Sequence, residues 1–238
     1  MYSILFICIL AALSAETPMV HSQAIPPVDQ ILERMLHHEA EQARELKHYE
    51  AIRHYQVQYK GFGTIIAAKM DVDVKFDNRS GKSLRILSQS GSKLLCDKVL
   101  KRAVDSEQEA SEDKSSTALT TANYRFRLAG TEQLDGRLTY ILQVDPLKQS
   151  KFLYRGRVWV DAVDYAVVKI DAEPAKNPSF WISRAQIQSI NSRTDGVWLP
   201  QNTRSESRIR VGGTAQLTID YGTYSVDRVE QSQGAASQ

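Results

Sequence analysis

Few residues of this 238-residue sequence stand at spacings that could do chemistry. Residues 38–42 read HEAEQ, which begins like the helical zinc-protease motif. That motif needs a second histidine four residues after the first, so that two imidazoles lie on one helix face. Gln42 stands there instead, so no zinc site is expected, and His37 and Glu41 are interpreted as an exposed pair on a helix.

Two other motifs are also incomplete. Residues 81–83 (Gly-Lys-Ser) end like a phosphate-binding loop, but Phe76 occupies the position of its first glycine. Residues 88–91 lack the first glycine of a nucleophile elbow. Cys96 lies among apolar neighbours, which is typical of a packed core thiol. We therefore expect no catalytic residue, metal ligand or cofactor, and we keep an exported enzyme only as a third hypothesis.

The charge of the chain is nearly balanced. Its 30 Lys and Arg and 28 Asp and Glu are interspersed and give a formal net charge of +2. Nucleic-acid-binding proteins concentrate positive charge on one face, so nucleic acid is not an expected partner. Cys8 would leave with an export signal and Cys96 would remain alone, so no internal disulfide is expected and stability must come from packing.

The N-terminus is typical of an export signal. An almost wholly apolar run from Tyr2 to Ala15 is followed by the small-residue site at 22–24. The run has about 14 residues, fewer than the roughly 20 that cross a bilayer as a helix. We therefore predict that residues 1–24 are a signal peptide cleaved near Ala24, which makes the protein periplasmic. No Lys or Arg precedes the run, so a retained anchor stays an alternative.

Two stretches have the apolar spacing of a helix. In the first, from Val28 to about Tyr49, apolar residues recur every three to four positions. The second runs from Leu94 to Val104 and gives way to residues 106–116, which are acidic and serine-rich. We expect two amphipathic helices, the second followed by a mobile loop.

Most of the remaining sequence alternates between apolar and polar residues. The clearest run, Met70 to Phe76, is followed by a turn signal at residues 78–81. Similar runs continue to Val226 with gaps too short for crossover helices, so neighbouring strands must be antiparallel. We expect about nine or ten strands in a sheet that curls strongly or closes. Residues 25–229 would form one domain and residues 230–238 a disordered tail.

Two stretches of the strand region carry a family resemblance. Residues 154–170 look like a strand-turn-strand in mid-sheet, and residues 195–200 look like the turn that opens a late strand. With the N-terminal helix and the helix after the third strand, the chain resembles the LolA-like group of periplasmic proteins. That group contains outer-membrane lipoprotein-sorting factors and the LolB and RseB N-terminal folds.

The resemblance implies both a fold and a site. The implied fold is mainly β with two or three helices, a strongly curved antiparallel half-open barrel capped by helices. Acyl chains or another lipid would lie inside it. The resemblance also implies polar residues that gate the cavity, and Arg53, near the start of the first strand, is the one candidate here.

These observations lead to a preferred function and an alternative. The preferred function is a non-catalytic, monomeric carrier of lipid or lipoprotein acyl chains, because burial at about 0.8 kcal/mol per methylene gives affinity without polar recognition. The alternative is an RseB-like regulatory module that binds an envelope membrane protein and senses lipid. The expected lining residues are Met70, Val72, Val74, Phe76, Leu84, Ile86, Tyr124, Phe126, Leu138, Tyr140 and Leu142 on strands, and Ile31, Met35, Leu95 and Val99 on helices.

Overall fold

The structure, a computed structural model, describes residues 25–229. The predicted signal with its cleavage site and the predicted tail lie outside the described residues. The helices are α1 (Val28–Glu45), α2 (Lys93–Leu95), the π-helical turn η1 (Cys96–Leu100), α3 (Lys101–Glu112) and α4 (Lys114–Thr117). The strands are β1 (Leu46–Gly61), β2 (Thr64–Asp77), β3 (Gly81–Gly91), β4 (Tyr124–Leu134), β5 (Arg137–Pro146), β6 (Tyr154–Asp161), β7 (Val167–Pro174), β8 (Ile182–Thr194), β9 (Val197–Ile209), β10 (Thr214–Asp220) and β11 (Ser225–Arg228).

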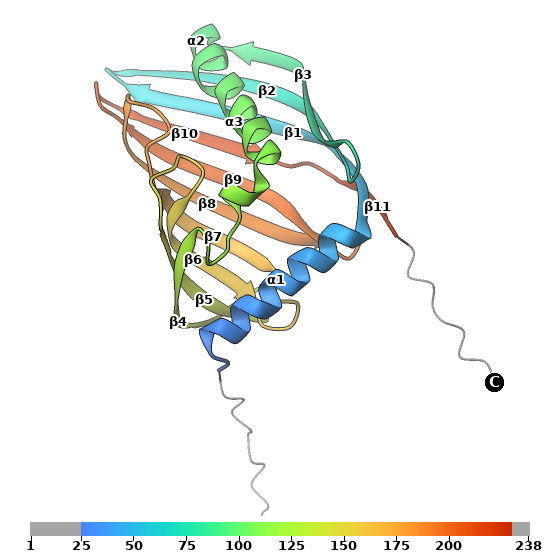
Figure 1. The fold of residues 1–238 in the computed structure, drawn as a ribbon. Helices are drawn as coiled ribbons and strands as arrows, with labels where there is room; N and C mark the ends of the chain where they lie inside the picture. Colours follow the sequence, from blue (N-terminus) through green and yellow to red (C-terminus); the bar gives the residue numbers. More distant parts are fainter. Residues whose placement is uncertain (1–24, 230–238) are drawn as a thin grey trace, which may run out of the picture.

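All of these strands belong to one 11-stranded antiparallel sheet. Its order is β3-β2-β1-β10-β9-β8-β7-β6-β5-β4, and β11 pairs with the start of β1. β3 and β4 are the edges and do not pair with each other within residues 25–229, so the sheet stays open. It curves around α1 and the α2–α3 segment, which lie over its concave side (Figure 1). The expected mainly β, strongly curved and half-open architecture is therefore confirmed.

Alternation in the sequence produces one buried and one exposed face of the sheet. In β1, every second residue from Ala51 to Val57 is buried and the residues between them are exposed. The hairpin turns at residues 135–136 and 195–196 are Asp-Gly pairs, and all four residues have positive φ. This is the geometry that connects neighbouring strands with a right-handed twist.

The first helix ends earlier than predicted. α1 stops at Glu45 rather than near Tyr49, and β1 begins at Leu46 rather than near Ile52. Leu46 and Tyr49 fit a helical spacing, but both side chains are buried in the sheet's own core. Their backbone pairs with β11 on one side, and that of Tyr49 also pairs with β2 on the other. Long-range pairing therefore overrides the local pattern.

The prediction of a mobile loop at residues 106–116 is wrong. α3 continues to Glu112 and α4 follows at Lys114–Thr117. Glu107 is held by ion pairs with Arg53 and Lys82, and Asp113 caps α4 by accepting a hydrogen bond from the N–H of Ser116. These contacts keep an acidic, serine-rich segment helical.

Apolar side chains on the concave face gather in two clusters. The first cluster joins β1 and β2 to η1 and includes Val72 and Leu100, both fully buried. The second cluster joins α1 to β4–β6 and includes Ile31, Met35 and Leu142, all fully buried. Cys96, at 3% exposure, belongs to the first cluster, as predicted for a core thiol. The two helical segments therefore cover opposite ends of the concave face.

Candidate functional site

On the inner face of the sheet, the side chains between the two clusters differ in size and burial from those within the clusters. Directly opposed residues of neighbouring strands point to the same side, so the register defines rows of side chains across this face. One row reads, from the first cluster to the second, Val57, Leu217, Ser205, Ile187, Ala172, Gly156 and Val144. Both end residues are fully buried in their clusters. The residues between them are small, or are aliphatic and only half-buried.

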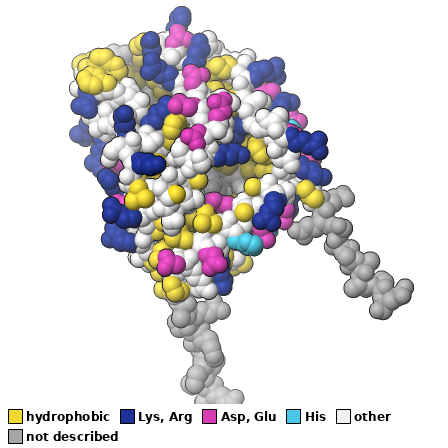
Figure 2. Space-filling model, in the orientation of Figure 1, with side chains coloured by type: hydrophobic (Ala, Val, Ile, Leu, Met, Phe, Trp, Pro, Cys, Tyr) yellow, Lys and Arg dark blue, Asp and Glu magenta, His cyan; other side chains and the backbone are white. Residues whose placement is uncertain are grey.

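A neighbouring row repeats this arrangement. It reads Tyr55, Ile219, Thr203, Ser189, Ile170, Val158 and Leu142. The serine and threonine again fall in the middle, and the bulky buried residues fall at the ends. The centre of the inner face therefore carries less side-chain volume than its two ends. Figure 2 shows a hollow there, between α1 and the α3–α4 segment, with hydrophobic side chains in its wall.

The structure places the predicted lining residues mainly at the two ends of this hollow. Ile86 and Leu138 are exposed, at 40% and 42%, because β3 is an edge strand and Leu138 directly follows the turn into β5. Phe76, Leu84, Val99 and Phe126 are partly buried against the clusters. The others are buried within the clusters, namely Ile31, Met35, Met70, Val72, Val74, Leu95, Tyr124, Tyr140 and Leu142.

Sequence reasoning missed the residues at the centre of the inner face. Ser205, Thr203 and Ser189 carry no apolar signal, and apolar alternation was the pattern used to select lining residues. Their positions follow only from the register of β8 and β9, in which Ser205 opposes Ile187. The candidate site is thus marked by small side chains at its centre and not by large apolar ones.

Arg53 is a buried charge inside the sheet. Its side chain is 1% exposed on the inner face of β1. Nη1 donates a hydrogen bond to Oε1 of Glu107 on α3, and the guanidinium lies 4.5 Å from the ring centroid of Tyr221. Oε1 of Glu107 also accepts from Nζ of Lys82 at 3.1 Å, and Oε2 accepts from the hydroxyl of Tyr55 at 3.0 Å. We call this group the Arg53–Glu107 latch, because it fastens α3 to β1 and β3.

The latch keeps both of its main partners charged. Burial alone would lower the pKa of Arg53, but Glu107, Tyr221 and Tyr55 together outweigh burial and hold that pKa above its ordinary value. Burial would likewise raise the pKa of Glu107, but Arg53 and Lys82 outweigh it and hold that pKa below its ordinary value. Burial and Glu107 together raise the pKa of Tyr55, so its hydroxyl remains a donor.

Polar side chains lead from the latch toward the middle of the sheet. The Tyr221 hydroxyl lies 3.3 Å from Oγ1 of Thr203, which in turn lies 2.9 Å from Oγ of Ser189. Nε of Arg53 is buried and has no hydrogen-bond partner among the described residues. The floor of the hollow therefore combines aliphatic side chains with a short line of hydroxyl groups on the side of the latch.

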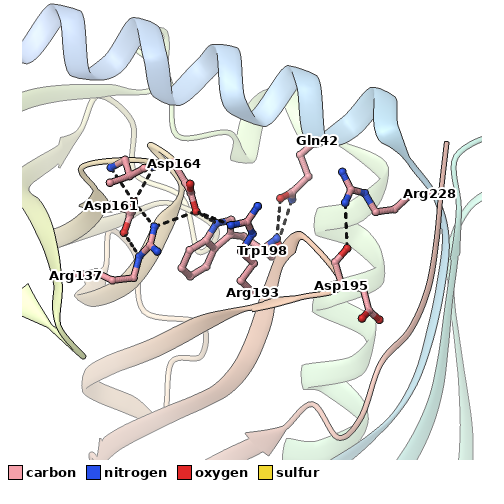
Figure 3. A network of polar contacts seen from close by, with 9 residues as sticks. Gln42, Arg137, Asp161, Asp164, Arg193, Asp195, Trp198 and Arg228 are labelled. Atoms are coloured by element: carbon pink, nitrogen blue, oxygen red, sulfur yellow. Dashed lines mark hydrogen bonds and ion pairs between the residues drawn. The ribbon is translucent and has the colours of Figure 1, made fainter. Parts of the chain in front are cut away.

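The C-terminal half of α1 is fixed to the sheet by Gln42 (Figure 3). Its side-chain amide donates to the carbonyl oxygen of Trp198 at 3.1 Å and accepts from the Trp198 N–H at 2.9 Å. Arg228 of β11 donates to the Glu45 carboxylate and to the carbonyl oxygen of Asp195, the latter at 3.2 Å. The side chain of Gln42 thus pairs with a backbone group of β9 much as another strand would.

Asp161 organises the loop beneath this contact (Figure 3). Its side chain is fully buried, and its carboxylate accepts from Nε and Nη2 of Arg137 at 2.6 and 2.8 Å. The N–H groups of Val163 and Asp164 donate to it as well. Burial would raise the pKa of Asp161, but these hydrogen bonds hold it below its ordinary value. Asp164 then accepts from Nε1 of Trp198 at 3.0 Å, which connects the loop to β9.

The carboxyl group of Glu39 on α1 has a raised pKa. The side chain is open to solvent, yet enough protein surrounds it that desolvation raises its pKa. Glu39 also contributes to raising the pKa of Tyr154 on β6, after burial and Tyr124.

Several other titratable groups form exposed pairs on the surface. His37 lies 3.1 Å from Glu41 on the exposed side of α1, as predicted from their spacing. Within residues 25–229, no group of His, Cys, Asp and Glu side chains is arranged to hold a metal ion. No helix in the described part of the chain is long and apolar enough to cross a membrane.

Comparison with known proteins finds similar chains among solved structures only. No family model matches the chain, and no curated protein sequence matches it. A DUF1329 family protein from Desulfovibrio piger is 14% identical with a TM-score of 0.44, and the match covers 85% of this chain and 94% of that chain. A LolA superfamily protein from Nitrosomonas europaea is 11% identical with a TM-score of 0.37, covering 86% and 96%. The Pseudomonas aeruginosa MucA/MucB complex gives 11% identity and a TM-score of 0.28, covering 84% and 100%. A LolA superfamily protein is among the solved structures that this chain is similar to.

Proposed function

We propose that this protein binds the acyl chains of a lipid or lipoprotein in the hollow of the sheet and carries them through the periplasm. This proposal rests on the types of side chain on the inner face of the sheet. Small residues such as Ser205 and Ala172 occupy its centre, and half-buried aliphatic residues such as Ile187 and Leu217 stand beside them. A concave surface of small and half-buried aliphatic side chains is suited to binding a hydrocarbon chain.

The energetics favour a hydrocarbon ligand. Each methylene that leaves water for this face would contribute about 0.8 kcal/mol. Ile170, Ile187 and Ile219, which are half-buried, would lose their remaining water contact at the same time. Affinity would therefore grow with chain length and would need no directional polar contact.

The Arg53–Glu107 latch gives the proposed carrier a lid. α3 lies over one side of the hollow and is tied to β1 through Glu107, whereas α1 is tied to β9 through Gln42. Moving α3 outward would separate a buried arginine from its counter-charge, which is costly. The latch would therefore favour the closed arrangement until a ligand fills the space beneath α3.

The alternative is a regulatory module that binds an envelope membrane protein, and a free loop at residues 106–116 would have offered it a contact element. In the structure this segment is helical, and Glu107 and Glu109 are engaged with Arg53 and Lys151. The carrier function is therefore the better supported of the two.

The proposal can be tested by filling the hollow. Ser205→Trp would place a large side chain on the inner face, and Glu206→Trp would place the same side chain on the outer face of the same strand. Native mass spectrometry of protein from cells should show a bound lipid. Titration with a fluorescent fatty acid should give at least about tenfold weaker binding for Ser205→Trp and unchanged binding for Glu206→Trp. An unliganded protein that binds no fatty acid, or equal effects of the two variants, would contradict the proposal.

A further inference from the structure

Three loops at one end of the sheet carry large exposed hydrophobic side chains. The β1–β2 turn carries Phe62, which is 79% exposed, and Ile65 follows it at 57%. The β7–β8 loop carries Phe180 and Trp181 at 76% and 57%, and the β9–β10 turn carries Val211 at 57%. We call these five residues the aromatic rim. Figure 2 shows hydrophobic side chains gathered over the ends of the β1–β2 and β9–β10 hairpins, beside Lys and Arg side chains.

The loops that carry the aromatic rim are tied to one another. Arg210 donates from its backbone N–H to the carbonyl oxygen of Trp181 at 2.9 Å, and from Nε to that of Phe180 at 2.6 Å. The rings of Phe180 and Trp181 meet edge to face, 5.5 Å apart. The ring of Phe62 lies so close to Gly212 that a Cβ atom there would come within 3.1 Å of it. The exposed rings are therefore held by specific contacts.

The aromatic rim is surrounded by positive charge. The three segments that carry it, residues 60–65, 175–184 and 208–214, contain no Asp or Glu. A cavity of about 560 Å³ opens beside Phe62, lined by residues 60–65, 213 and 214. The cations of these segments are Lys60, Lys176, Arg184, Arg208 and Arg210, of which Arg184 is ion-paired with Glu173 of β7.

We propose that the aromatic rim docks the protein on an anionic phospholipid bilayer. Phe and Trp side chains favour the membrane interface, and Lys and Arg beside them attract anionic headgroups. Packing two rims of this chain together would oppose like charges, so charge complementarity favours a lipid surface over a second copy. The inference goes beyond the proposed function, because a bilayer can be bound with or without an acyl chain in the hollow.

Vesicle flotation of the purified exported chain tests this inference. The chain should float with vesicles of phosphatidylglycerol and phosphatidylcholine in equal parts, and not with vesicles of phosphatidylcholine alone. Raising the salt concentration should release it, because headgroup attraction is screened. Tryptophan emission should shift to the blue on binding, because Trp181 is 57% exposed and would change its surroundings. Trp159 is 2% exposed, and Trp198 is half-buried at the start of β9, at the other end of the sheet, so neither should change.

Single substitutions separate docking from cargo binding. Trp181→Ser and Phe62→Ser should each lower vesicle binding about tenfold, and Lys60→Gln about fivefold. The control is Val163→Ser, since Val163 is 78% exposed in the β6–β7 loop at the other end of the sheet. Fatty-acid binding should be unchanged in all four variants, and so should the melting temperature.

Several outcomes would overturn the inference. They are the absence of binding to anionic vesicles, equal binding by the rim variants and the control, and self-association that depends on Phe62 and Trp181 in analytical ultracentrifugation. A failure of fatty-acid binding in the unmodified chain, with vesicle binding intact, would reject the proposed function and leave the docking surface standing.

Discussion

Arg53 and Glu107 stand 54 positions apart in the sequence and form an ion pair on the inner side of the sheet. The arginine side chain is 1% exposed and the glutamate side chain 22% exposed. Because β1 supplies one partner and α3 the other, this pair decides where the second helical segment rests. Loss of the glutamate charge would leave the buried arginine without this counter-charge.

Glu107→Gln should lower the free energy of unfolding by about 3 kcal/mol, because it leaves Arg53 buried without a counter-charge. Urea denaturation monitored by circular dichroism measures this difference. Glu109→Gln is the matched control, because Glu109 pairs with Lys151 at 2.7 Å on an exposed part of the same helix. The control should change the free energy of unfolding by less than about 1 kcal/mol. Equal losses in the two variants would show that Arg53 does not depend on Glu107.

The protein should lose stability in acid. The pKa values of Glu107 and Asp161 in the folded protein lie below the ordinary values of 4.5 and 3.8. The unfolded chain therefore binds protons at higher pH than the folded chain, so the stabilisation is complete above about pH 5 and is lost as the pH falls through the folded-state values. Urea midpoints measured between about pH 6 and pH 3 should fall, and they should fall less steeply in Glu107→Gln. A midpoint that is constant or rises toward pH 3 would contradict this prediction.

The sequence predicts the architecture well because alternation reports directly on which side of a strand is buried. Met70, Val72 and Val74 are buried on β2, as their alternation with polar residues indicated. The end of α1 could not be placed in this way, since Tyr49 fits both a helical and an alternating pattern. The pairing of Tyr49 with Val226 of β11, at the other end of the chain, decides between them.

The candidate site was less accessible to sequence reasoning. Arg53 stands two positions after the buried Ala51 and two before the buried Tyr55, so its place on the inner face could have been inferred. A buried arginine requires an acidic partner. Nothing local identified Glu107 as that partner, because the surrounding segment has the composition of a loop. Ser205 could not be assigned either, since its role depends on the register between β8 and β9.

Two predicted lining residues on one strand should respond differently to truncation. Leu142→Ala should lower the free energy of unfolding by about 3 kcal/mol, because the fully buried side chain leaves a cavity in the second cluster. Leu138→Ala should lower it by less than about 1 kcal/mol, because that side chain is 42% exposed. Thermal and urea unfolding measure both. A large loss for Leu138→Ala would mean that its surface is covered in solution.

The buried carboxylate of Asp161 should contribute strongly to the stability of the protein. Asp161→Asn keeps the shape of the side chain but removes the charge that faces Arg137, and it puts an amide NH₂ among hydrogen-bond donors. We expect a loss of about 3 kcal/mol in the free energy of unfolding. Asp135→Asn is the control, because Asp135 lies in a hairpin turn at φ 48°, a conformation that asparagine also adopts. Hydrogen exchange at the backbone N–H of Trp198 should be faster in Asp161→Asn alone, because Asp164 connects the Asp161 loop to the indole of Trp198. Unchanged protection of that N–H would show that Gln42 holds α1 to β9 without help from the loop.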